Sequence, residues 1–185
     1  MYRLRFLVLV GLILAAAASR LIPHPPNFAP IGAMALFGGA CFAHRGAAFV
    51  VPLAAMFLSD LAIGLLSGNL SVGLHRLIPV VYGSFGLIVC LGFWLRTRRT
   101  VVPIAGATLA GSVLFFVLTN FGVWAMGSWY PNTWAGLVAC YVAAIPFFYN
   151  TLLGDAVYST ALFGGLALAE RGLPALREPA LALPK

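Results

Sequence analysis

Two aspartates, Asp60 and Asp155, lie in stretches of sequence that are otherwise apolar, in a chain with only 4 acidic residues. A charged side chain at the centre of a bilayer costs about 2.5 to 3.5 kcal/mol on insertion scales, so such a residue usually faces a partner, water or a ligand. Carboxylates in this setting commonly bind solutes or relay protons. The two aspartates are therefore the first candidates for a functional site.

Other polar side chains fall near these aspartates in helical spacing or in depth. Tyr158 follows Asp155 by three residues and would share its helical face, and Trp124 lies one turn from Asn120. An apolar pocket with a few convergent polar groups is the usual form of a small-molecule site. The predicted solute-binding residues are Asp60, Asp155, Asn120, His24, Asn27, Arg20, Trp124, Tyr158 and Asn150.

The same residues allow a second interpretation. Prolines on both sides of His24 stiffen its loop, which could present the imidazole to a ligand. Alternatively, the polar residues form a structural network in which Arg20 pairs with Asp60 and Asn120 caps a neighbouring helix. If the site binds a solute, Asp60→Asn or Asp155→Asn should abolish binding and leave the fold largely intact.

No pattern in the chain indicates catalysis, a metal or a cofactor. Leu153-Gly154-Asp155 resembles part of the glycine-rich motif of intramembrane aspartyl proteases, but Leu152 stands where that motif has its first glycine. The 3 cysteines form no Cys-x-x-Cys pair, and no His/Cys cluster has zinc spacing. We therefore expect no catalytic residues, no metal site and no cofactor, and the chain is not expected to be an enzyme.

The composition is that of an integral membrane protein. Of 185 residues, 62% are hydrophobic and 8% are charged, against roughly 25% charged residues in soluble domains. The formal net charge is +7, but the basic residues occur in short groups between apolar segments, as at the ends of membrane spans. This distribution argues against nucleic acid as a partner and makes the lipid bilayer the expected environment.

Apolar length and turn signals predict an all-α fold, a bundle of six transmembrane helices in a single domain, 1–171. The small residues Gly32, Ala35 and Gly39 are spaced for close helix packing. The first segment also has the layout of a cleavable signal peptide, with Ala18-Ser19 at its end. The predicted spans are 1–22, 28–43, 46–66, 77–95, 101–126 and 151–170.

Two further segments complete the prediction. Residues 127–150 are rich in aromatic residues and contain Pro131 and Pro146, a composition that suits an interfacial or re-entrant element. The tail, 172–185, contains 3 prolines and little periodicity, so we expect it to be poorly ordered and cytoplasmic.

The basic residues predict the orientation. Short loops rich in Lys and Arg stay in the cytoplasm. If both termini are cytoplasmic, 9 of the 11 basic residues lie inside and only Arg20 and Arg76 lie outside. The prediction is a multi-pass protein of the cell inner (plasma) membrane whose candidate site faces the external leaflet.

Several short segments carry a resemblance to a known family. They are Leu21–Phe28, Ala33–Gly39, Leu58–Asp60, Thr119–Trp124, Tyr130-Pro131 and Asn150–Asp155. Together they resemble a bacterial membrane family known as a domain of unknown function, whose members are usually labelled as transport proteins. That family is in turn similar in size and layout to the substrate-binding S components of energy-coupling factor (ECF) transporters, six-helix proteins that capture vitamins or metal ions from outside.

The resemblance implies a function and a partner. By analogy, the chain would be a transport subunit that captures a small solute, such as a vitamin, a cofactor precursor or a metal ion, from the external side. A transmembrane coupling subunit with ATPases would dock on Gly11, Ala15 and Ala18 of the first span. Two alternatives stay open: a non-transporting membrane scaffold or assembly protein, and a proton-coupled secondary transporter that uses Asp60 and Asp155.

Overall fold

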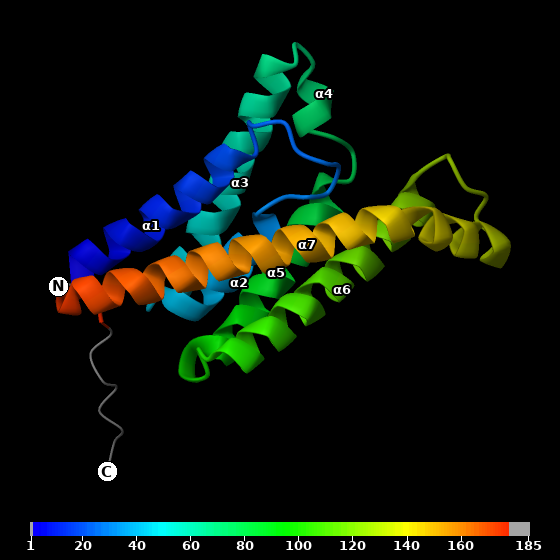
Figure 1. Cartoon of the computed structure of the whole chain (residues 1–185). Coiled ribbons are helices and arrows are strands. Elements are labelled where there is room, and N and C mark those ends of the chain that lie inside the picture. Colours follow the sequence, from blue (N-terminus) through cyan, green and yellow to red (C-terminus); the bar gives the residue numbers. More distant parts are fainter. Residues whose placement is uncertain (1, 178–185) are drawn as a thin grey trace.

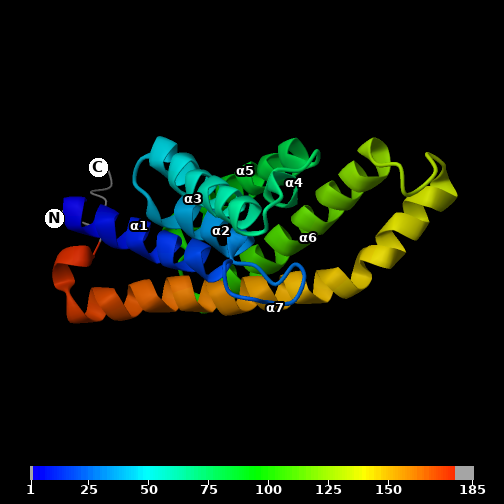
Figure 2. The ribbon, with the colours of Figure 1, turned by 90° about the horizontal axis from the view of Figure 1, so that it is seen from above.

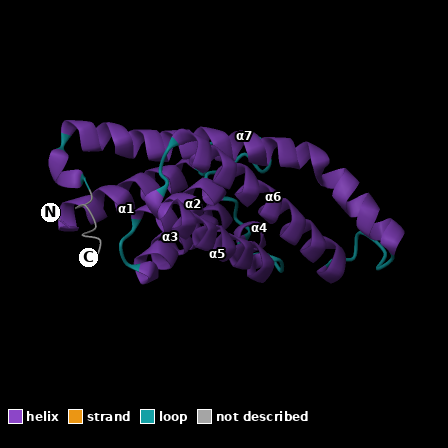
Figure 3. Cartoon of the chain, turned by 90° about the horizontal axis from the view of Figure 1, so that it is seen from below, coloured by secondary structure: helices purple, strands orange, loops and turns teal. Residues whose placement is uncertain are grey.

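The computed structural model describes residues 2–177, and these are helical with no strand (Figure 1). The predicted all-α fold is confirmed, and short loops join the helices (Figure 3). The helices are α1 (Tyr2–Ser19), α2 (Ile31–Cys41), α3 (Arg45–Leu66), α4 (Leu70–Gly73), α5 (Ile78–Trp94), α6 (Val101–Met126) and α7 (Trp134–Gly172), with 3-10 turns at Leu95–Thr97 and Pro174–Leu176.

Within the described residues, four helices are long and apolar enough to cross a membrane: α3, α5 with its following turn, α6 and α7. All six predicted spans contain helix, but the count of six crossings is not confirmed. The second predicted span is the clearest difference, because α2 has only 11 residues and therefore a length of about 16 Å, against a hydrocarbon core of about 30 Å.

Residues 134–150 do not form a separate element between two spans, because they are continuous with the last long helix. Only a short hairpin connection precedes Trp134, and the remainder of 127–150 is the first part of α7, a helix of 39 residues. Thr133 caps the start of α7, because its hydroxyl oxygen accepts a hydrogen bond from the Gly136 N–H at 3.2 Å. Pro146 lies inside the helix, where neighbouring groups in a bundle make proline tolerable. Figure 2 shows that α7 bends in its yellow part.

The centre of the molecule is α2. It contacts α1, α3, α5, α6 and α7, and every residue from Ala33 to Cys41 is buried. A Cβ atom added at Gly39 would collide with the carbonyl oxygen of Val89, and one added at Gly92 would collide with that of Leu36. The two glycines therefore let the backbones of α2 and α5 approach closely, as the spacing of small residues predicts for α2.

Arginines gather at one end of the bundle, which we call the basic end. Arg5 forms an ion pair with Glu170 at 2.6 Å, which joins the start of α1 to the end of α7. The guanidinium groups of Arg45 and Arg96 lie over the Phe93 ring, at 5.6 and 4.6 Å from its centroid. The start of α1 and the end of α7 lie together, far from the hairpin between α6 and α7 (Figure 2).

The start of α1 and the 3-10 turn Pro174–Leu176 are both packed at this basic end. Leu9 and Ile13 on α1 are buried in the core, so α1 is an integral part of the bundle and its removal as a signal peptide would expose that core. Arg5 also donates to the carbonyl oxygen of Leu176, which is fully buried. The predicted poorly ordered tail, 172–185, is therefore packed at its start; residues 178–185 fall outside the described part of the chain.

Candidate functional site

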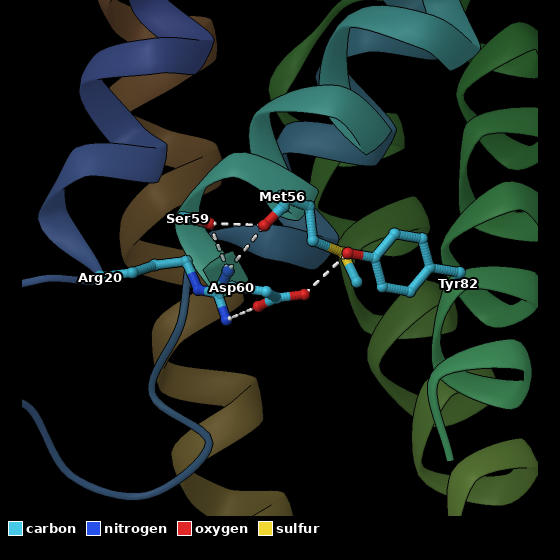
Figure 4. Close-up of polar contacts among 5 residues, drawn as sticks. All are labelled: Arg20, Met56, Ser59, Asp60 and Tyr82. Atoms are coloured by element: carbon cyan, nitrogen blue, oxygen red, sulfur yellow. Dashed lines mark hydrogen bonds and ion pairs between the residues drawn. The ribbon is translucent and has the colours of Figure 1, made fainter. Parts of the chain in front are cut away.

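Asp60, on α3, forms an ion pair with Arg20, which directly follows α1. The Arg20 Nη2 and Asp60 Oδ1 atoms are 2.6 Å apart, and the hydroxyl of Tyr82 on α5 donates to Oδ2 at 2.8 Å (Figure 4). Both carboxylate oxygens thus have partners, and they link three helices. The predicted pairing of Arg20 with Asp60 is therefore confirmed.

Arg20 makes further contacts with two residues of α3. Its Nη1 donates to the hydroxyl of Ser59 and, at 3.3 Å, to the carbonyl oxygen of Met56. The side chains of Arg20 and Asp60 are only 12% and 9% exposed. Removing one partner of such a buried pair typically costs about 3 to 5 kcal/mol, because the other charge is left uncompensated.

Asp155, on α7, lies at the N-terminus of α2. The Ser112 hydroxyl donates to its Oδ2 at 2.6 Å, and the backbone N–H of Ala33 also bonds to the carboxylate. Pro30, the N-cap residue of α2, has no side-chain capping bond. Asp155 therefore supplies the cap from another helix, where its negative charge also complements the α2 dipole.

The short length of α2 explains why this carboxylate occurs in the middle of an apolar helix. Inside a bilayer every backbone polar group has to be satisfied by protein, and α2, with 11 residues and a length of about 16 Å, is too short to reach both surfaces of a hydrocarbon core of about 30 Å. At its other end, Arg96 donates to the carbonyl oxygens of Gly39 at 3.1 Å and Phe42 at 2.8 Å. A carboxylate and a guanidinium thus close the two ends of one buried helix.

A cavity of about 400 Å³ opens between these groups, at the end of the bundle opposite the basic end. It lies among the end of α1, the start of α2, the last turns of α3, the start of α5, and the facing parts of α6 and α7. Six of the nine predicted residues line it: Arg20, His24, Asn27, Asp60, Asn120 and Asp155.

The other three predicted residues brace the cavity from outside. Asn150 donates from Nδ2 to the carbonyl oxygen of Pro26 at 2.9 Å. Tyr158 accepts a hydrogen bond from the Ser19 hydroxyl at 2.8 Å, and Trp124 donates to the carbonyl oxygen of Pro131 at 3.1 Å. These contacts hold the loop between α1 and α2 and the hairpin between α6 and α7.

The remaining predicted contact, a cap by Asn120, is wrong. Its Nδ2 donates to the carbonyl oxygen of Phe116 in its own helix, at 2.8 Å. This bond is local, so the Asn120 side chain contributes a polar group to the cavity wall and caps no neighbouring helix.

Sequence reasoning missed Tyr82, His75 and the aromatic wall of the cavity. The wall contains Phe85, Phe115, Phe116 and Phe147. The sequence feature that could have identified Tyr82 is its depth in a predicted span. Tyr82 lies five residues into 77–95, and Asp60 lies six residues before the end of 46–66. Tyr82 and Asp60 are therefore expected at similar depths in neighbouring helices.

The cavity contains both signs of charge. Arg20 offsets Asp60, while Asp155 is offset by hydrogen-bond donors, and His24 and His75 add two imidazoles. Among the described residues, no group of three His, Cys, Asp or Glu side chains is placed to hold a metal ion. The arrangement can bind a small polar or amphipathic molecule through these groups and the aromatic wall.

Fold and site together define a helical bundle of membrane type with a polar cavity between its helices. The chain belongs to a family of unknown function, DUF6580, whose model matches residues 2–176. The resemblance to a membrane family of unknown function is thus confirmed, whereas nothing in this match connects the family with transport or with S components. Comparison with curated proteins and with solved structures gives no significant match.

Proposed function

We propose that the protein is a membrane subunit that binds a small solute in the cavity beside Arg20, Asp60 and Asp155. The observation that carries this proposal is a cavity of about 400 Å³ with three charged side chains in its wall, inside a bundle whose outer surface is apolar. Burying these charges is costly in a membrane. The bonds of these charged groups to their structural partners explain why each charge lies where it does. They do not explain the cavity, because a fully packed interior could make the same bonds.

Orientation and partner form the second part of the proposal. If the basic end is cytoplasmic, the cavity opens outside and the solute is captured there, as in an S component. In the six-span arrangement, α1 crosses fully, and α2 with its flanking loops reaches only part of the way. Gly11, Ala15 and Ala18 are exposed on α1, which leaves their face open to a coupling subunit with ATPases.

Two other functions make different demands on the same residues. A scaffold is favoured by the ion pair of Arg20 with Asp60 and by the cap that Asp155 forms, because both have structural roles. A proton-coupled secondary transporter needs a carboxylate that gains and loses a proton. Asp155 suits that role better than Asp60, since the charge of Asp60 is held by Arg20.

A thermal-shift screen of the purified protein tests the proposal. The panel contains vitamins, cofactor precursors, divalent metal ions and small metabolites, because a ligand at 100 times its dissociation constant adds about 2.7 kcal/mol of stability. Val123→Trp fills the cavity, whereas Val113→Trp makes the same change at an exposed position of α6. We expect a hit that Val123→Trp abolishes and Val113→Trp retains. A folded wild-type protein that responds to nothing would favour the scaffold.

A further inference from the structure

A second hollow lies on the outer surface of the basic half of the bundle, between α6 and α7. This groove has a volume of about 680 Å³ and is separate from the cavity. Its wall is mostly apolar and includes Ile104, Leu109 and Phe163. Thr108 and Ser159 lie on its floor and are hydrogen-bonded to each other at 3.0 Å, so the groove itself presents an apolar surface.

The groove has the length of one leaflet. Along α6 its lining runs from Thr100 to Ser112, which is about 18 Å at 1.5 Å per residue. Half of a hydrocarbon core is about 15 Å. A transmembrane helix from another subunit would need a contact surface through both leaflets, but the groove ends at Ser112 and Leu152.

Positive charge marks the other end of the groove. Arg99 lines it there, and the guanidinium of the preceding Arg98 lies over the Trp94 ring, 5.0 Å from its centroid. Tryptophan rings favour the headgroup level of a bilayer. The groove lining contains no acidic residue among the described part of the chain, so no carboxylate of the lining repels a negative group at headgroup depth.

We propose that this groove binds an anionic phospholipid from the leaflet at the basic end. The phosphate lies between Arg98 and Arg99, within reach of the Thr100 hydroxyl, which makes no capping bond to α6. One acyl chain runs along Ile104 and Leu109 toward Ser112. Basic pockets between transmembrane helices are a recurrent form of anionic lipid site, and arginine forms paired hydrogen bonds to phosphate.

Native mass spectrometry of the full chain, exchanged into neutral detergent with added lipid, tests this site. The probes are phosphatidylglycerol and phosphatidylcholine with identical acyl chains. We expect retention of phosphatidylglycerol over phosphatidylcholine. Arg98→Gln/Arg99→Gln should reduce it about tenfold or more, the loss expected when charge-assisted hydrogen bonds to a phosphate are removed.

Two further variants separate charge from shape. Ala156→Trp obstructs the groove without changing charge, since Ala156 is exposed in its lining, and should also lose the lipid. Arg45→Gln/Arg76→Gln removes the same charge outside the groove and should retain it. Equal retention of both lipids, or an unchanged ratio in Arg98→Gln/Arg99→Gln, would overturn the proposal in favour of unselective annular lipid. A dimer that Ala156→Trp dissociates would overturn it in favour of a second copy of the chain.

Discussion

Asp155 on α7 lies directly against Gly32 in the first turn of α2. A Cβ atom at residue 32 would be 2.5 Å from Oδ1 and 2.9 Å from Oδ2 of that carboxylate. The cap of α2 therefore depends on a residue without a side chain at this position. This contact joins an early helix of the chain to its last long one.

Gly32→Ala should destabilise the protein, by about 1 to 3 kcal/mol, because the added methyl group displaces a carboxylate that Ser112 holds in place. Thermal unfolding in detergent measures the change. Gly11→Ala is the matched control, since a Cβ atom there meets nothing within 4 Å, and helix propensity alone would stabilise that variant by up to about 1 kcal/mol. Equal midpoints for the two variants would contradict the close contact.

The ion pair of Arg20 with Asp60 predicts a non-additive mutant cycle. Asp60→Asn should cost about 3 to 5 kcal/mol, because it leaves Arg20 unpaired. The sequence alone had led us to expect that Asp60→Asn would leave the fold largely intact, and the ion pair reverses that expectation. Arg20→Met/Asp60→Leu should be less destabilised than either single replacement, since no buried charge is left over. The unfolding free energies of four proteins, the wild type, Arg20→Met, Asp60→Leu and the double variant, decide; simple additivity would show that the pair is not coupled.

Tyr82→Phe should lower stability by about 1.5 kcal/mol or more, because the hydroxyl bonds to a charged carboxylate at 2.8 Å. Tyr149→Phe removes a hydroxyl from a side chain that is 62% exposed and should change little. Both are compared by thermal unfolding. The hydrogen bond would contribute nothing to stability if the two variants unfolded together.

Asn150→Ala should loosen the loop between α1 and α2, because it removes the bond to the carbonyl oxygen of Pro26. The loss of one such bond, about 1 kcal/mol, predicts roughly fivefold faster amide hydrogen exchange in the loop. Exchange mass spectrometry of residues 21–30 is the measurement. Exchange in α6 should stay at the wild-type level, and a uniform increase throughout the chain would indicate general destabilisation instead.

Apolar length and turn signals located most of the helices. The predicted 101–126 matches α6 from Val101 to Met126, and 46–66 differs from α3 by one residue. The sequence did not reveal that 134–150 is continuous with the last helix, because aromatic residues and Pro146 are equally compatible with an interfacial element and with a bent helix in a bundle. The choice depends on packing between α6 and α7, which composition does not encode.

The site was predicted in outline because depth follows from topology. Arg20, Asp60 and Asn120 meet at one end of the bundle for that reason. The role of Asp155 was not predictable, since a cap supplied from another helix depends on where α2 stops. Asn150 and Tyr158 lie at the right depth but contact backbone and Ser19 rather than the cavity, and depth does not determine which way a side chain points.

The brevity of α2 has a consequence for biogenesis. A segment of 11 residues is too short to be inserted as an independent span, and side chains from other helices, Asp155 and Arg96, bond to backbone groups at its two ends. Both residues are synthesised after α2, and Asp155 belongs to the last long helix. When α2 leaves the ribosome, its terminal N–H and C=O groups have no partners, which is costly in hydrocarbon. The centre of the protein is therefore completed last, and a chain interrupted before Asp155 leaves its innermost helix uncapped.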